Sequence, residues 1–182
     1  MRIIGGVFGG RRLFVPRGLR IRPTADQVKE AVFNILGPLV EGARVLDLFA
    51  GVGALGLEAM SRGAAEAVLV DREPAALEAI RRNVATLGLA GIMVHRIDLT
   101  RGPGRLKKEE PFNLIFLDPP YGRNLAPRAL NLIARLGLAA PEAWAVVEHG
   151  PGDELAPVEA AWRLIQRRTY GQTMVTFFQM KN

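Results

Sequence analysis

The sequence predicts a doubly wound α/β fold with a mainly parallel sheet. From residue 44 onward, short apolar segments alternate with segments of helical periodicity. Strands that are apolar throughout indicate a sheet covered on both faces, because a strand with one solvent-exposed face would alternate apolar and polar residues. Two β-rich runs near the C-terminus, separated by Gly171 alone, predict an antiparallel hairpin at one edge of the sheet.

The first 40 residues predict a small basic unit ahead of this domain. Two β-rich runs, 2–4 and 11–15, are joined through four glycines, which is typical of a hairpin or a flexible arm. A capping box formed by Thr24 and Gln27 then predicts a helix over 25–36. We therefore expect residues 1–40 to form a basic N-terminal hairpin or arm and a helix, and residues 41–182 to form the α/β domain.

The elements of the α/β domain follow from the spacing of apolar residues. One helix is bounded by Pro74, which lies in its first turn, and by Gly88, which follows its last residue. The expected strands are 43–49, 67–71, 92–97, 112–117 and 144–149, the expected helices are 54–62, 74–87 and 127–136, and the expected hairpin strands are 162–170 and 172–180.

Composition excludes several classes of protein. The chain contains no cysteine, which excludes disulfides, thiolate metal sites and cysteine nucleophiles. It has no G-x-S-x-G or H-E-x-x-H motif, which argues against serine hydrolases and zinc proteases, and we expect no metal. No apolar run reaches the roughly 18 residues that span a bilayer, and the first residues lack the features of a signal peptide. We expect a cytoplasmic protein with no membrane partner.

Charge is distributed unevenly along the chain. Residues 1–30 carry seven lysines and arginines against two acids, residues 31–159 carry thirteen against sixteen, and residues 160–182 carry four against none. Basic ends indicate a polyanionic partner, while the slightly acidic middle indicates a different ligand. The net charge of +6 is equally compatible with arginines that only keep the surface soluble.

Four of the expected strands deliver an aspartate to the same edge of the sheet. These residues are Asp47, Asp71, Asp98 and Asp118. In a doubly wound sheet, ligands bind beyond the carboxyl ends of the strands. We therefore expect these four carboxylates to surround the functional site.

The segment from Gly51 to Gly56 matches the dinucleotide-binding pattern G-x-G-x-x-G, and Asp71 follows Gly51 by 20 residues. Asp47 argues against a dinucleotide, because its carboxylate would repel the pyrophosphate that binds at such a turn. S-adenosylmethionine carries no phosphate, and its ammonium and sulfonium groups are cationic. The acidic strand ends therefore favour this methyl donor, with S-adenosylhomocysteine as the product.

We assign the donor site to the glycine turn and the acidic strand ends. The glycines let the backbone approach the methionyl part, Asp71 can accept both ribose hydroxyls, and Asp98 can accept the adenine amino group. The expected donor-binding residues are Asp47, Phe49, Ala50, Gly51, Gly53, Asp71, Arg72, Asp98 and Leu99.

The tetrapeptide Asp118-Pro119-Pro120-Tyr121 predicts the catalytic site. An exocyclic amine on a nucleobase is a poor nucleophile, because its lone pair is delocalised into the ring. The Asp118 carboxylate and the Pro119 carbonyl can accept both amine hydrogens and localise that lone pair toward the methyl group. Tyr121 can stack on the extruded base. A turn that only ends a strand would explain the two prolines, but not the acid before them or the aromatic ring after them.

Motifs along nearly the whole chain resemble the RsmD family of bacterial 16S rRNA guanine-N2 methyltransferases. They are RIIGG, GRRL, RPTADQVKEAVFNIL, VLDLFAGVGALGLEAMSRGA, FNLIFLDPPY and YGQT. The resemblance implies a class I methyltransferase fold of Rossmann type, S-adenosylmethionine as donor, and guanine 966 of 16S rRNA as the target during small-subunit assembly. Two residues depart from the family pattern: Val52 replaces a small hydroxyl residue, and Gln27 replaces a common arginine.

An RNA substrate would give the basic N-terminal segment a function. The expected partner is 16S rRNA or the assembling small ribosomal subunit, bound by a monomer. The expected RNA contacts are Arg11, Arg12, Arg20, Arg22, Lys29 and Arg123, although each could instead be a solvated surface residue.

Three other functions remain open at this point. An amino-methyltransferase acting on another RNA or on the N6 amine of DNA adenine would share the catalytic tetrapeptide. Against a sequence-specific DNA adenine methyltransferase, only 71 positions separate Asp47 from Asp118 and about 60 follow, which leaves no room for a target-recognition domain. A non-catalytic rRNA-binding assembly factor would have no use for carboxylates facing phosphate. An NAD-dependent oxidoreductase would bind NAD and not S-adenosylhomocysteine.

Overall fold

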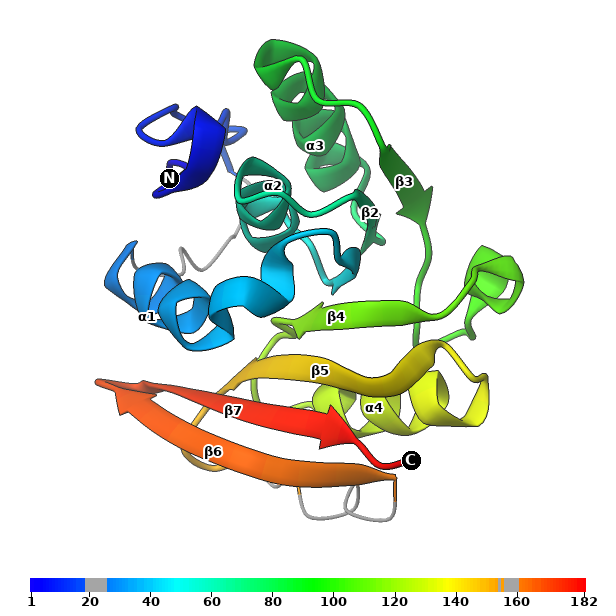
Figure 1. Ribbon diagram of the computed structural model, residues 1–182. Coiled ribbons are helices and arrows are strands. Elements are labelled where there is room, and N and C mark those ends of the chain that lie inside the picture. The colour runs from blue at the N-terminus through cyan, green and yellow to red at the C-terminus, as the bar shows by residue number, and fades with distance from the viewer. Residues whose placement is uncertain (19–25, 154, 156–160) are drawn as a thin grey trace.

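The computed structural model describes residues 1–18, 26–153, 155 and 161–182. Its described strands form one mixed sheet in the order β3-β2-β1-β4-β5-β7-β6 (Figure 1). The strands are β1 Arg44–Leu48, β2 Glu66–Asp71, β3 Ile92–Arg96, β4 Phe112–Leu117, β5 Ala139–His149, β6 Trp162–Tyr170 and β7 Thr173–Met180. The helices are α1 Asp26–Leu36, α2 Ala54–Ser61, α3 Pro74–Leu87 and α4 Leu125–Arg135, with 3₁₀ turns η1 Gly6–Phe8, η2 Gly37–Val40 and η3 Gly104–Lys108.

The topology confirms the predicted doubly wound sheet with an antiparallel edge. Strands β1 to β5 pair in parallel, with β1 between β2 and β4. β7 then pairs antiparallel with both β5 and β6. The order of the strands reverses beside β1, so the turn after β1 and the turn after β4 lie next to each other at the carboxyl edge. This is the place where open α/β sheets bind their ligands.

Two hydrophobic clusters cover the two faces of the sheet. Successive residues of the buried strands point to opposite faces, so both faces require apolar side chains. One cluster includes Val45, Leu114 and Phe116 and packs against α1, α2 and α3. The other includes Leu46, Ile115 and Leu117 and packs against α4 and η3. The full burial of these strands explains why their sequences are apolar without alternation.

The N-terminal residues form an ordered hairpin on α2, one of the two predicted possibilities. The Ile3 N–H donates to the Arg11 carbonyl (2.9 Å), and the Gly10 N–H donates to the Ile3 carbonyl (2.9 Å). Ile3 is fully buried in the same cluster as α1, α2 and the sheet. The N-terminal hairpin therefore shares its core with the α/β domain, which a flexible arm would not do.

Element bounds differ from prediction mainly around α4 and β5. α4 begins at Leu125, two residues before Pro127, because the first helical N–H groups need no intrahelical acceptor and a proline in the first turn costs nothing. β5 begins at Ala139 rather than at Trp144. Its first part carries a register shift against β4, and Glu142 there has a positive φ of 59°. Apolar periodicity could not predict this part, since Pro141 and Glu142 are exposed. None of the helices in the described ranges is long and apolar enough to cross a membrane.

Candidate active site

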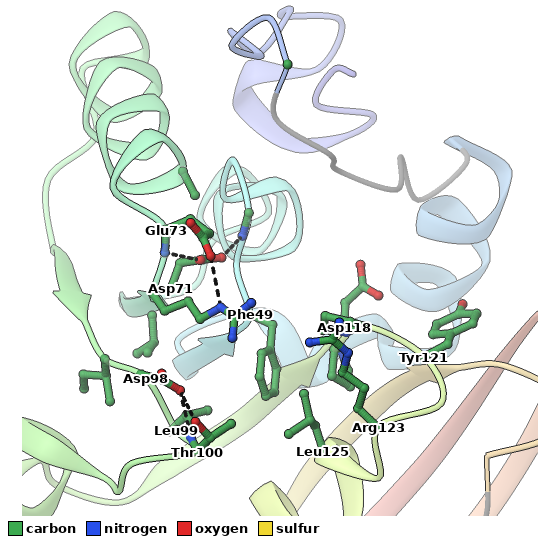
Figure 2. A pocket seen from close by; sticks show the side chains of 18 residues that line it. Phe49, Asp71, Glu73, Asp98, Leu99, Thr100, Asp118, Tyr121, Arg123 and Leu125 are labelled. Atoms are coloured by element: carbon green, nitrogen blue, oxygen red, sulfur yellow. Dashed lines mark hydrogen bonds and ion pairs between the residues drawn. The ribbon is translucent and has the colours of Figure 1, made fainter.

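A cavity of about 690 Å³ lies at the carboxyl edge of the sheet (Figure 2). It is bounded by the turn after β1, the end of β2, the loop after β3 and the turn after β4. Of the predicted site residues, eleven line it: Phe49, Gly51, Asp71, Arg72, Asp98, Leu99, Asp118, Pro119, Pro120, Tyr121 and Arg123. The fold therefore brings the expected donor site and the expected catalytic tetrapeptide into one cavity.

Asp71 holds the glycine turn in place. The Gly51 N–H donates to one Asp71 carboxylate oxygen (Oδ2, 2.8 Å), and the Glu73 N–H donates to the other (Oδ1, 2.9 Å). Gly53 begins α2 with a φ of +84°, and a Cβ atom there would lie 2.8 Å from a Leu69 methyl carbon. A side chain at position 53 would therefore be strained and would collide with β2. Gly53 shapes the turn without lining the cavity.

Asp47 does not line the cavity, which corrects the expectation that its carboxylate faces the donor. Its neighbours Leu46 and Leu48 point to the α4 face of the sheet, so Asp47 points to the opposite face, beneath α2. There it is buried and accepts the Gly56 N–H (2.8 Å). Burial raises the pKa of Asp47 to about 7, the Gly56 N–H partly offsets this rise, and the negative charge of Asp71 adds to it. Ala50 is likewise buried outside the cavity lining, where its N–H donates to the Val70 carbonyl (3.0 Å).

The loop after β3 presents Asp98 and Leu99 to the cavity. One Asp98 carboxylate oxygen accepts both the Thr100 hydroxyl (2.6 Å) and the Thr100 N–H (3.0 Å). These two hydrogen bonds, with the charges of Arg72 and Arg101, lower the pKa of Asp98 despite some desolvation. An ionised carboxylate is thus fixed beside Leu99. Thr100 was not identified from the sequence. An aspartate followed two residues later by a polar residue is typical of an Asx turn, and this spacing could have predicted the contact.

The turn after β4 carries Asp118 and Tyr121 into the other side of the cavity (Figure 2). The Tyr121 hydroxyl donates to the buried Glu148 carboxylate at the end of β5 (3.3 Å). The Tyr121 ring packs against Gly150, where a Cβ atom would lie 2.8 Å from the ring carbon Cδ2. Tyr121 is therefore held from both its hydroxyl and its ring.

Asp153 joins this turn to the end of β5. One of its carboxylate oxygens accepts the Gly122 N–H (2.9 Å), and the other accepts the Gly150 N–H (2.9 Å). Sequence reasoning missed Asp153, because an aspartate in a Gly-Pro-Gly-Asp segment is typical of any turn. Its link to Gly122 spans 31 residues and becomes visible only in the fold.

The residues predicted to contact RNA differ in how exposed they are. Arg11 and Arg12 are exposed on the N-terminal hairpin, and Arg123 is exposed at the cavity. Lys29 is fully buried, so the expectation that it contacts RNA is wrong. Its ammonium forms an ion pair with Glu58 (3.0 Å) and donates to the Arg2 carbonyl. Arg20 and Arg22 lie outside the described residues.

Glu58 is the centre of this buried network. Its carboxylate accepts the N–H groups of Ile4 (2.7 Å) and Gly5 (2.8 Å) and pairs with Arg62 (2.8 Å) as well as with Lys29. Burial alone would raise the pKa of Glu58, but the Ile4 N–H and the two cations outweigh it and lower the pKa. The network attaches the N-terminal hairpin and α1 to α2. Among the described residues, no three histidine, aspartate or glutamate side chains are grouped so that they could hold a metal ion.

Comparison with known proteins gives matches along nearly the whole chain. Residues 1–179 match the family described as "Conserved hypothetical protein 95". The chain is 39% identical to "Ribosomal RNA small subunit methyltransferase D" of Escherichia coli strain K12, over 98% of this chain and 89% of that protein. It is 38% identical to "Putative rRNA methyltransferase YlbH" of Bacillus subtilis strain 168, over 100% of both.

A solved structure supports the same conclusion. "Putative methyltransferase yhhF" from Escherichia coli has a TM-score of 0.89 and 40% identity, covering 100% of this chain and 98% of that one. The fold is therefore that of the class I methyltransferases, and the chain belongs to the RsmD family of small-subunit ribosomal RNA methyltransferases.

Proposed function

We propose that this protein transfers a methyl group from S-adenosylmethionine to the exocyclic N2 amine of a guanine in 16S ribosomal RNA, at position 966 by the family resemblance. The observation that carries the proposal is a single cavity lined both by Gly51 and Asp71 and by Asp118 and Tyr121. A donor bound at the first pair and a base bound at the second would meet in that cavity.

The residues around the glycine turn fit S-adenosylmethionine. The cavity volume falls within the range of about 300 to 1,000 Å³ that is usual for small-ligand sites. Carboxylates of Asp71, Glu73 and Asp98 line it, which suits the cationic ammonium and sulfonium groups of the donor. Because Asp47 lies outside the cavity, its carboxylate gives no ground for excluding a dinucleotide, and the choice of S-adenosylmethionine rests on the methyltransferase family of the chain. Each Asp71 oxygen accepts one backbone N–H and keeps a further lone pair for a ribose hydroxyl. When bound, S-adenosylmethionine supplies a methyl group on a positively charged sulfur.

The catalytic turn supplies what the amine needs. The Asp118 carboxylate and the Pro119 carbonyl accept the two amine hydrogens, so the nitrogen lone pair faces the methyl group. The nitrogen–carbon bond forms as the sulfur–carbon bond breaks, and S-adenosylhomocysteine leaves. The methylated nitrogen then releases one proton to Asp118 or to water. Tyr121, held by Glu148 and Gly150, supplies a ring of fixed orientation against which the extruded base can stack.

The choice of ribosomal RNA as substrate is supported by the relatives and by charge. The Escherichia coli relative is named for small-subunit ribosomal RNA, and the Bacillus subtilis relative for rRNA. Exposed Arg11, Arg12 and Arg123 lie on the N-terminal hairpin and at the cavity, where they can contact phosphates.

The test is transfer of a radiolabelled methyl group to three substrates: small-subunit particles that lack the modification, naked 16S rRNA, and duplex DNA. The proposal predicts label in ribosomal RNA and none in DNA. Label on DNA adenine would support the DNA methyltransferase alternative. Absence of label from every substrate, with rRNA binding retained, would support the non-catalytic assembly factor.

A further inference from the structure

A second cavity of about 270 Å³ continues from the active site along α4. Four residues line both cavities, namely Phe49, Leu99, Thr100 and Leu125. In Figure 2 they lie in the centre and along the lower side of the active-site cavity. The remaining lining residues are Arg101, Gly102, Pro103, Arg128, Ala129, Leu132 and Arg135. We call this second cavity the α4 groove.

Three arginines and no acidic residue line the α4 groove. Arg128, Leu132 and Arg135 are spaced i, i+4 and i+7, so one face of α4 presents them together. Arg128 and Arg135 are exposed, and neither has a salt bridge to any described residue. Arg101 lies on the facing loop, and its side chain is 88% exposed and forms an ion pair with Asp98 (3.7 Å). The groove is therefore a local concentration of positive charge in an otherwise slightly acidic segment of the chain.

Apolar and basic residues of the α4 groove differ in exposure. Its apolar residues are buried or half-buried, whereas its three arginines are exposed; the apolar ones are Phe49, Leu99, Pro103, Leu125, Ala129 and Leu132. This combination suits a ligand that is anionic along one side and apolar along the other, as a nucleotide strand is. Seven positions along α4 separate the Cα atoms of Arg128 and Arg135 by about 10 Å. A single small anion would not need arginines so far apart.

We propose that the α4 groove binds the ribose-phosphate backbone of the ribosomal RNA strand that flanks the target guanine. This inference rests on the proposed function, because it takes the RNA as the substrate. The N-terminal hairpin packs on the α1, α2 and α3 face of the sheet, and α4 lies on the other face (Figure 1). The RNA strand would therefore contact basic residues on both sides of the active-site edge, and not on the N-terminal side alone.

Charge reversal on α4 tests the proposal. Arg128→Glu and Arg135→Glu are each compared with Arg81→Glu, which makes the same charge change at an exposed position of α3. Three quantities are measured: the KM for unmodified small-subunit particles at several salt concentrations, the Kd for naked 16S rRNA by filter retention, and the Kd for the donor by calorimetry.

The proposal predicts that each α4 variant raises the KM and the RNA Kd by about 5-fold or more relative to Arg81→Glu. It also predicts that each lost contact lowers the slope of log Kd against log salt concentration by about 0.7. Donor affinity should stay within about 2-fold of the wild type, since neither arginine lines the donor cavity.

Two outcomes would overturn the proposal. If both α4 variants match Arg81→Glu in KM and in salt dependence while the wild type methylates rRNA, the groove does not bind RNA and the proposed function stands. If the α4 variants lose activity on particles but bind naked rRNA normally, the groove contacts a protein of the particle instead. A wild type that transfers no methyl group to rRNA contradicts the proposed function itself, which separates that failure from the other two.

Discussion

Asp118 directly follows β4 and lines the active-site cavity, and the proposed reaction depends on its carboxylate. Replacing Asp118 by Asn keeps the shape of the side chain but removes its charge and one acceptor oxygen. We expect turnover to fall by about 10² to 10³-fold, as for loss of one preorganised hydrogen-bonding group, while the donor Kd changes by less than about 2-fold. Single-turnover methyl transfer and calorimetry measure the two quantities.

Asp98→Asn is the matched comparison for Asp118→Asn. Asp98 lines the same cavity and belongs to the proposed donor site, so its loss should raise the KM for the donor and leave turnover at saturating donor close to that of the wild type. If both variants lose turnover equally, or if Asp118→Asn keeps full turnover, the division of roles between the two carboxylates is wrong.

Asp47 predicts a specific dependence of stability on pH. Its pKa is about 7 in the folded chain and 3.8 in the unfolded chain, so the folded state binds the extra proton between these values. The free energy of unfolding therefore falls as pH rises from about 4 to 7. Above pH 7 the total loss is at most roughly 4 kcal/mol.

The variant Asp47→Asn should remove that cost while keeping an oxygen to accept the Gly56 N–H. Urea unfolding is measured at several pH values. Between pH 5 and 7, the free energy of unfolding of the variant should rise relative to that of the wild type by up to about 1.4 kcal/mol per pH unit. A difference in unfolding free energy that does not vary with pH would show that Asp47 is already ionised in the folded protein.

The turn after β4 is held in place by the loop after β5. Asp153 accepts N–H groups from both, and Tyr121 reaches Glu148 at the end of β5. We expect Asp153→Ala to lower turnover by about 10-fold or more, because small displacements of reacting groups are costly, while donor affinity stays unchanged. Asp153→Asn, which keeps one acceptor oxygen, should give an intermediate rate.

Glu78→Ala removes an exposed carboxylate from α3 and is the control for Asp153→Ala. Steady-state kinetics and urea unfolding are measured on all three variants. Asp153 is a positioning residue if turnover falls much more than stability does. A parallel loss of stability and turnover, with no partial rescue by Asp153→Asn, would assign it a structural role only.

The elements also indicate where sequence reasoning works and where it stops. Apolar strands and glycine-bounded helices were predictable because burial on both faces leaves a strong pattern, as in β4 and α3. Lys29 was misassigned because its charge was considered without its position. It lies three and four residues before Val32 and Phe33, on the buried face of α1. Its partner Glu58 lies in α2, and a contact across 29 residues of sequence leaves no local signal.

The distribution of charge along the sequence differs from the distribution of charge on the protein surface. Lys29 adds to the basic N-terminal count but is buried and paired. Arg101, Arg128 and Arg135 belong to the slightly acidic middle of the chain, yet the fold gathers them in the α4 groove. Most residues of the active-site cavity were predictable, because parallel strands end at the same edge of the sheet. The groove was not, since it depends on how a loop and a helix pack together.

The proposed activity is methylation of the N2 amine of a guanine in 16S rRNA. It is tested by mass spectrometry of nucleosides and mapped fragments from small-subunit particles incubated with S-adenosylmethionine and the wild-type protein, with Asp118→Asn as the slow control at the same short incubation time. We expect N2-methylguanosine at position 966 with the wild type and at least about 10²-fold less with the variant. Methylation of a different base or a different atom, or equal methylation by the variant, would contradict the proposed activity.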